Sequence, residues 1–158
     1  MKKLAALIAC VVLAACAHQG PRETSPYQLI ENPAESAQPV ALQILRYLAA
    51  GDIEQAARFS NAPERRAEVL REFRARVGEE EFKRVYREYL APGNRVTTEF
   101  GLGPRRLIVW KLGTAGDRVV GQYYLLVDSR FVMDDEPSAE RAELARTLRA
   151  FRDKDLRP

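Results

Sequence analysis

The chain has 158 residues, with 25 Lys and Arg against 22 Asp and Glu, two cysteines and one histidine. So few cysteines exclude a disulfide framework, and the single His18 excludes histidine-based catalytic triads and metal centres in their usual form. Lys2 and Lys3 lie in a segment that we expect to be removed, which leaves 23 basic and 22 acidic residues. Nucleic-acid-binding domains usually carry a marked basic excess, so this balance argues against a nucleic-acid partner.

The first 15 residues have the pattern of a leader. Met1-Lys2-Lys3 is positively charged, and an apolar run follows from Leu4 to Ala15. As a helix that run is about 18 Å long, well short of the ~30 Å hydrocarbon core of a bilayer. A basic start, a short apolar stretch and small residues at its end are typical of a secretory signal peptide, which we predict over residues 1–15.

The run ends in Leu13-Ala14-Ala15-Cys16, which resembles the lipobox of bacterial lipoproteins. The resemblance implies a diacylglycerol on the Cys16 sulfur, cleavage before it, and anchoring through acyl chains in the cell envelope, facing the periplasm. Ala17 stands where an inner-membrane retention signal has Asp, which favours the outer membrane. Acylation would also leave no cysteine for a thiol nucleophile or a metal site.

Two alternatives to lipidation at Cys16 stay open. The segment can be an ordinary signal peptide in which this cysteine is incidental. Leu7-Ile8-Ala9-Cys10 fits the same motif, but lipidation at Cys10 would leave an apolar run of only six residues, below the roughly 7–15 that a signal peptide uses.

Residues 16–39 are predicted to form the lipidated cysteine and a flexible tether. Prolines, a glycine and scattered polar residues leave no sustained periodicity there. Tyr27, Leu29 and Ile30 are its one apolar cluster, and their docking on the folded part is an alternative. The remainder, residues 40–154, has the length of one domain.

Residues 40–89 carry helical periodicity. Gly51-Asp52 ends a first helix and begins a short second one, with Asp52 as its N-cap. Asn61-Ala62-Pro63-Glu64 predicts the start of a third helix capped by Asn61, and Pro92-Gly93 ends a fourth. The inward-facing stripes comprise Val40, Ile44, Tyr47 and Leu48, then Val69, Leu70, Phe73 and Val77, then Phe82, Val85, Tyr86 and Tyr89.

From Arg95 the sequence changes to four runs rich in β-branched and aromatic residues, VTTEF, RRLIVWKL, RVVGQYYLLV and RFVM. Asp128-Ser129 between the last two predicts a tight hairpin. A final helix over 138–152 is capped by Ser138 or Asp135. The predicted class is α+β, with N-terminal helices packed on a C-terminal antiparallel meander and a last C-terminal helix.

Two passages resemble NTF2-like (cystatin-like α+β) domains. They are AQPVALQILRYLAAGDIEQAARFSN at 37–61 and VVGQYYLLVDSRFVMDD at 119–135. The resemblance implies a cone of helices and curved sheet around a pocket, which relatives use for isomerase chemistry, ligand binding or assembly. The fold does not decide among these uses.

Isomerase-like chemistry requires a carboxylate base and nearby proton donors. Glu99 is the candidate base, and Trp110, Tyr123 and Tyr124 are candidate pocket residues. Each also has a plain structural interpretation, with Glu99 on the wet face of its strand and the aromatic residues in the core or at its rim. Tyr123 and Tyr124 are expected on opposite faces.

Two charged features are assigned structural roles. Asp134-Asp135-Glu136 is interpreted as acids placed before a helix N-terminus, where the macrodipole favours them, rather than as a cation site. The arginines of the third helix are interpreted as a solvated face screened by its own glutamates, rather than as a surface for anionic lipid. These are Arg65, Arg66, Arg71, Arg74 and Arg76, with Glu64, Glu68 and Glu72.

The sequence therefore predicts a lipid-anchored envelope lipoprotein whose small domain is not an enzyme and binds an envelope protein partner. We expect no cofactor and no metal ion. The alternative is an NTF2-like small-molecule pocket, either ligand-binding or isomerase-like.

Overall fold

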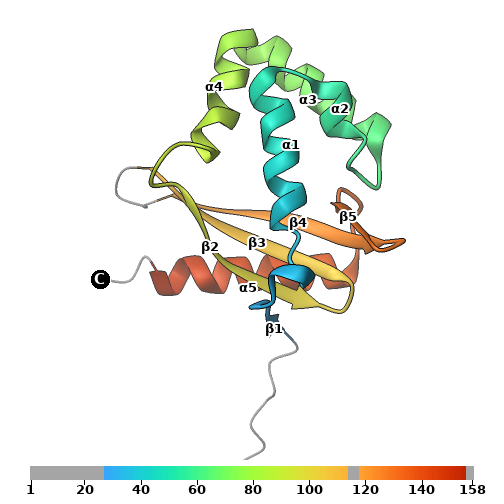
Figure 1. Cartoon of the computed structure of the whole chain (residues 1–158), viewed down its shortest axis with the longest axis vertical. Helices are drawn as coiled ribbons and strands as arrows, with labels where there is room; N and C mark the ends of the chain where they lie inside the picture. Colours follow the sequence, from blue (N-terminus) through green and yellow to red (C-terminus); the bar gives the residue numbers. More distant parts are fainter. Residues whose placement is uncertain (1–26, 114–117, 156–158) are drawn as a thin grey trace, which may run out of the picture.

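The computed structural model describes residues 27–113 and 118–155. In chain order its elements are β1 (Gln28–Leu29), a 3-10 turn η1 (Pro33–Glu35), α1 (Gln38–Ala50), α2 (Ile53–Ala57), α3 (Pro63–Val77), α4 (Glu79–Tyr89), β2 (Arg95–Leu102), β3 (Arg105–Leu112), β4 (Arg118–Val127), β5 (Arg130–Met133) and α5 (Ala139–Asp155). Helices first, then an antiparallel sheet and a last helix, confirm the predicted α+β class (Figure 1).

The sheet is a meander in which the strands lie side by side in the order β1-β2-β3-β4-β5, all antiparallel. The β4–β5 turn has positive φ at both Asp128 (47°) and Ser129 (62°), which a two-residue hairpin of type I′ requires. Phe131 and Met133 both pack on the face of the sheet that α1–α4 cover. The predicted hairpin is therefore confirmed.

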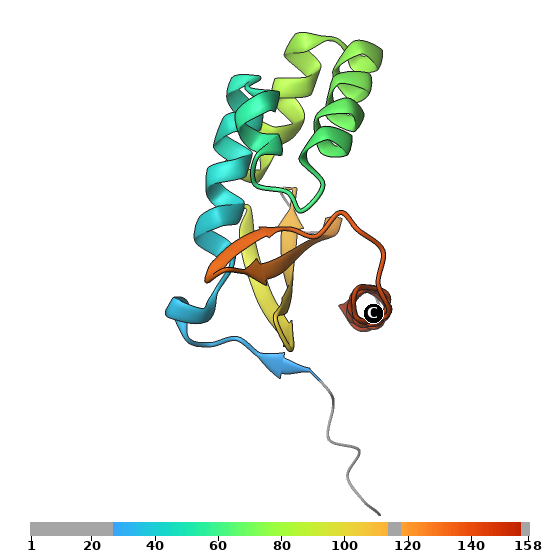
Figure 2. The same ribbon diagram turned by 90° about the vertical axis from the view of Figure 1, so that its right-hand side faces the viewer.

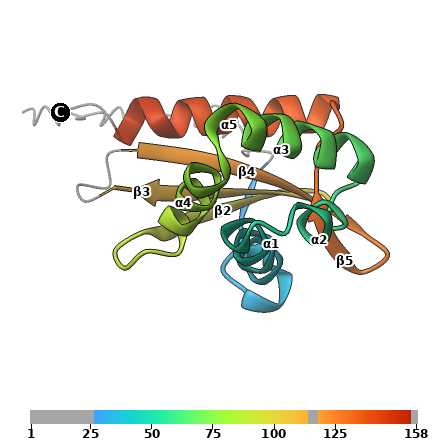
Figure 3. The same ribbon diagram turned by 90° about the horizontal axis from the view of Figure 1, so that it is seen from above.

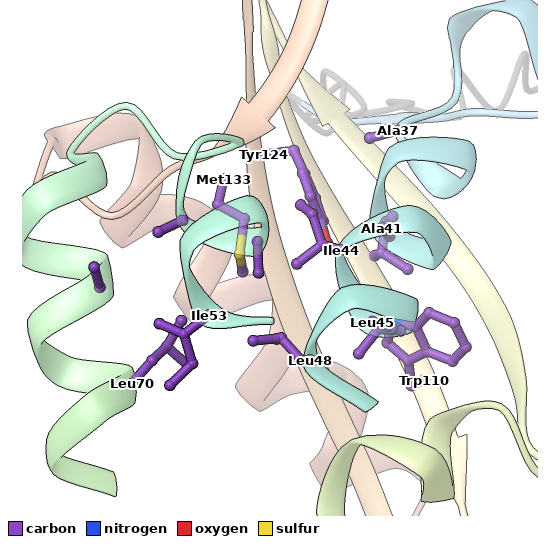
Figure 4. Packing of buried hydrophobic residues seen from close by; sticks show 14 of the residues in the cluster. Ala37, Ala41, Ile44, Leu45, Leu48, Ile53, Leu70, Trp110, Tyr124 and Met133 are labelled. Atoms are coloured by element: carbon purple, nitrogen blue, oxygen red, sulfur yellow. The ribbon is translucent and has the colours of Figure 1, made fainter. Parts of the chain in front are cut away.

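Helices cover both faces of the sheet. α1–α4 lie over one face and α5 lies over the other (Figures 1 and 2). The larger core fills the space under α1–α4, where Ile44, Leu48, Trp110 and Tyr124 are buried (Figure 4). A smaller core joins Leu107, Val109 and Val119 of the sheet to Leu144 and Leu148 of α5.

α5 packs very closely on the middle of β4. A Cβ at Gly121 would lie 2.5 Å from Leu148 Cδ2 and 2.9 Å from Leu107 Cδ1. Real Cβ atoms do not approach other carbons so closely, because interiors are packed at the density of organic crystals. Gly121 therefore lets α5 reach the sheet.

The folded domain begins before residue 40, so the predicted boundary is too late. Gln28 and Leu29 pair with Gly101 and Phe100 of β2, and the Tyr27 hydroxyl donates to the Glu143 carboxylate on α5. The tether predicted through residue 39 is wrong for residues 27–39. The physical reason is that this segment covers the edge of β2, which would otherwise leave backbone groups unpaired.

Two of three predicted helix caps are found. The Asp52 carboxylate accepts from the Gln55 N–H, and Ser138 Oγ accepts from the Arg141 N–H. The prediction for Asn61 is wrong, because α3 begins at Pro63 without a side-chain cap. The Asn61 side chain instead bonds to residues at the end of β5.

Candidate functional site

Glu99 lies on the face of β2 that α1–α4 cover, with only 6 % of its surface exposed. Its carboxylate accepts hydrogen bonds from Ser36 Oγ at 2.5 Å and from the Ala37 N–H at 2.8 Å. Ala37 immediately precedes α1, so the negative charge stabilises the positive end of that helix. The expectation that Glu99 faces water is wrong, because residues 30–37 fold over the edge of β2 and cover it.

Trp110 and Tyr124 lie deep in the same core and share one acceptor. Trp110 Nε1 donates to Gln122 Oε1 at 2.9 Å, and the Tyr124 hydroxyl donates to the same oxygen at 3.2 Å. Burial raises the pKa of Tyr124 far above its ordinary value, so its hydroxyl stays protonated at neutral pH. These groups satisfy one another inside the core and line none of the hollows described below.

Tyr123 lies on the opposite face of β4 from Tyr124, as strand alternation predicts. Its ring is 4.8 Å from the Arg141 guanidinium carbon, and burial raises its pKa. Among the residues that the structure describes, no hydrogen bond joins Glu99 to any of the three aromatic candidates. The four predicted pocket residues therefore do not form one site.

A polar junction joins the α2–α3 connection to the β5–α5 connection at one end of the molecule (Figure 3). It consists of Ser60, Asn61, Asp134 and Asp135. Asn61 Nδ2 donates to Asp134 Oδ1 at 3.0 Å, and Ser60 Oγ donates to Asp135 Oδ2 at 2.7 Å. The Asp134 side chain is 1 % exposed and is paired with Arg105 Nε at 3.0 Å. Asp134 and Asp135, predicted only to favour the positive end of a helix, therefore hold this junction together by hydrogen bonds.

Beside the junction, two adjoining hollows run along α3, and we call them together the α3 furrow. The first, of about 280 Å³, is lined by Arg65, Arg66, Val69, Asp135, Pro137 and Arg141. The second, of about 320 Å³, is lined by Arg66, Val69, Leu70, Glu72, Phe73, Arg76 and Tyr86. One end of the furrow is therefore rich in guanidinium groups, and the rest has an apolar floor.

Arg66 lines both hollows. Its Nη1 lies 3.3 Å from Asp135 Oδ1, whereas its Nε is buried and has no partner within the described part of the chain. A buried N–H without an acceptor costs free energy, so this guanidinium has donor capacity to spare. The prediction that glutamates of α3 screen its arginines is wrong here, because Asp135 near α5 pairs with Arg66 and Glu54 of α2 pairs with Arg71.

The furrow could not be predicted while Val69 was expected on the inward-facing stripe of α3. Val69 is 51 % exposed, whereas its neighbour Leu70 is buried. Consecutive helical residues point about 100° apart, so the adjacent pair was a signal that one of the two leaves the core. Arg141 and Asp135 carried no sequence signal for this site, since only the fold brings them to α3.

A second open groove lies where β1 and α1 meet β2. It has a volume of about 580 Å³, and Ile30, Leu42, Arg46, Val96 and Glu99 are among its lining residues. The groove lies at the edge of the sheet, between α1 and β2. Glu99 forms part of its wall, but both oxygens of that carboxylate already accept hydrogen bonds.

Cys16, the predicted lipidation site, and His18 lie outside the described residues. Within residues 27–113 and 118–155, no three His, Cys, Asp or Glu side chains are grouped so that they could hold a metal ion. No helix in those ranges is long and apolar enough to cross a membrane.

No family model, no curated protein and no solved structure matches the chain. The lipobox and NTF2-like resemblances therefore rest on the residues quoted above and stay predictions.

Proposed function

We propose that this chain is a lipid-anchored cell-envelope protein whose small domain binds a partner and performs no catalysis. The proposed lipid anchor is supported by the sequence Leu13-Ala14-Ala15-Cys16, which ends a 12-residue apolar run that follows a basic start. A diacylglycerol on Cys16 supplies two acyl chains, which suffice for stable membrane attachment, whereas a single chain is marginal.

Binding rather than catalysis is supported by what the candidate catalytic groups already do. Glu99 stabilises the start of α1, and Tyr124 donates to Gln122 inside the core. A general base needs a substrate proton within hydrogen-bond reach and a pKa near the working pH. Both oxygens of the Glu99 carboxylate already accept hydrogen bonds, and among the described residues none of these bonds comes from Trp110, Tyr123 or Tyr124.

The alternative of an NTF2-like pocket between sheet and helices has weaker support. Trp110 and Tyr124 fill that space together with the apolar face of α1. The open volumes described above lie at the surface, along α3 and at the edge of β2. Open surface grooves are better suited to binding a protein partner or an amphiphile than to catalysis, which favours an enclosed cavity.

The anchor is tested by replacing each cysteine in turn in the full-length chain. Cys16→Ser should abolish incorporation of a labelled fatty acid and remove the protein from the membrane fraction. Cys10→Ser is the matched control and should leave both unchanged. A Cys16→Ser protein that is cleaved and still fractionates with membranes would contradict the proposed anchor. Separation of inner and outer membranes on a density gradient then tests the outer-membrane assignment.

A further inference from the structure

We propose that the α3 furrow binds a single-chain amphipathic anion, with its carboxylate among Arg65, Arg66 and Arg141 and its acyl chain along α3. This inference rests on the proposed function only for the supply of the ligand, because a membrane surface is where acyl amphiphiles collect. The binding chemistry itself is argued from the described residues.

The head of the ligand is indicated by the charges at the α5 end of the furrow. Three guanidinium groups line the first hollow, and Asp135 is the only carboxylate among the described residues that line it. Asp135 already accepts from Ser60 and Arg66, so it does not neutralise the other two arginines. An incoming carboxylate would compensate this excess through charge-assisted hydrogen bonds to the guanidinium groups.

At the α4 end of the furrow the charges cancel. Glu72 and Arg76 line that end with opposite signs. The furrow therefore has one cationic end, which suits a ligand with a single anionic group at one terminus.

The tail is indicated by the apolar floor between the two ends. Val69, Leu70, Phe73 and Tyr86 line the second hollow. From Arg66 to Arg76 the helix rises about 15 Å, at ~1.5 Å per residue. Together the two hollows have the volume typical of a small-molecule site, and each CH₂ that they cover contributes about 0.8 kcal/mol.

An acyl chain fits these walls better than an extended peptide. Helices α3 and α4 form most of the second hollow, and helical backbone groups are bonded within the helix. An extended peptide lying there would gain no backbone hydrogen bonds from the protein for its own N–H and C=O groups, which would keep only their bonds to solvent. An acyl chain has no such groups, so it can lie against helical side chains at no polar cost.

The test uses the full-length protein in its own membranes and a dodecanoate probe that carries a diazirine in its chain. After irradiation and digestion, mass spectrometry locates the labelled residues. We expect labels in residues 63–89 or 135–141, competed by dodecanoate and not by dodecanol or dodecyltrimethylammonium. A phosphatidylglycerol with the same diazirine chain distinguishes a membrane lipid from a free amphiphile. Labelling of the furrow by the phospholipid alone, or equal competition by dodecanol, would overturn the proposal.

Substitutions in exposed furrow residues sharpen the test without disturbing the core. Arg65 is exposed and has no ion pair among the described residues, and Arg65→Gln should raise the competing dodecanoate concentration about three- to fivefold. Val69→Asp places a negative charge, the same sign as that of the ligand, in the apolar floor and should weaken labelling about tenfold or more. Arg84→Gln, which removes the same charge from an exposed site on α4, should change nothing.

If the Arg65 and Val69 variants are labelled like the wild type, or if labels fall only outside residues 63–89 and 135–141, the furrow is not the site. Thermal unfolding of each variant verifies that it is folded. The crosslinks are read wherever the protein fractionates, so a failure of this inference is distinct from a failure of the Cys16 anchor.

Discussion

Replacing Glu99 with alanine tests whether its carboxylate stabilises the start of α1. The substitution leaves the Ser36 hydroxyl and the Ala37 N–H without their acceptor at a buried site. Hydrogen bonds to a charged group contribute roughly 1.5–3 kcal/mol each, and a charge at a helix terminus adds about 0.3–1 kcal/mol. Because Ser36 is only half-buried and can turn toward solvent, we expect a total loss of about 3–4 kcal/mol. With about 130 folded residues, that loss lowers the melting temperature by about 10–15 °C.

Calorimetry or a circular-dichroism melt of the folded chain measures this loss directly. Glu99→Gln keeps one acceptor and should lie between alanine and the wild type. Glu80→Ala, at an α4 side chain that is 83 % exposed, is the matched control and should change the unfolding free energy by less than about 0.5 kcal/mol. If Glu99→Ala stays within about 1 kcal/mol of the wild type, the two hydrogen bonds do not hold the helix and the reasoning is refuted.

Two further predictions concern ionisation and the hairpin. Burial raises the pKa of Tyr124, so above about pH 10 the unfolded chain releases a proton that the folded chain keeps, and the free energy of unfolding falls by up to about 1.4 kcal/mol per pH unit. Tyr124→Phe should reduce this alkaline slope in urea titrations, and an unchanged slope would contradict the burial argument. Ser129 has a φ of 62°, which glycine adopts without steric cost, so Ser129→Gly should raise the free energy of unfolding by about 0.5–1 kcal/mol. A lower free energy of unfolding in the same assay would rule out the hairpin argument.

Secondary structure could be predicted here because its signals are local. The alternation of β-branched and aromatic residues from 95 to 133 fixes the strands, and Asp128-Ser129 fixes the last turn. The break at Gly51-Asp52 and the cap at Ser138 each depend on a few neighbouring residues. The opposite faces of Tyr123 and Tyr124 follow from the same alternation.

Contacts between distant segments could not be predicted, and they account for the errors at Asn61, Glu99 and Arg66. Asn61 has a capping-box pattern, but Asp134 and the backbone of Asp135, more than 70 residues later, take its side chain instead. The local strand pattern places Glu99 on the solvent-exposed face, but the residues before α1 cover it and bury it. Arg66 finds its partner near α5 rather than one helical turn away. The candidate furrow depends on these same long-range contacts, and the exposure of Val69 beside the buried Leu70 was its one local sign.

The early start of the domain also limits how far it can stand from the proposed anchor. If Cys16 is acylated, residues 17–26 alone join the lipid to the first described residue, Tyr27. Ten residues span at most about 35 Å, whereas the tether predicted over 17–39 could have spanned about 80 Å. For comparison, the 17 residues of α5 measure about 25 Å. An anchored domain would therefore lie within a distance of the bilayer that is only somewhat greater than the length of this helix. α3 and β1 lie at opposite ends of the domain (Figure 1), so an anchored domain would have to turn on its short tether to bring the α3 furrow to the membrane surface. A protein partner of the anchored domain would then lie at or near the same membrane.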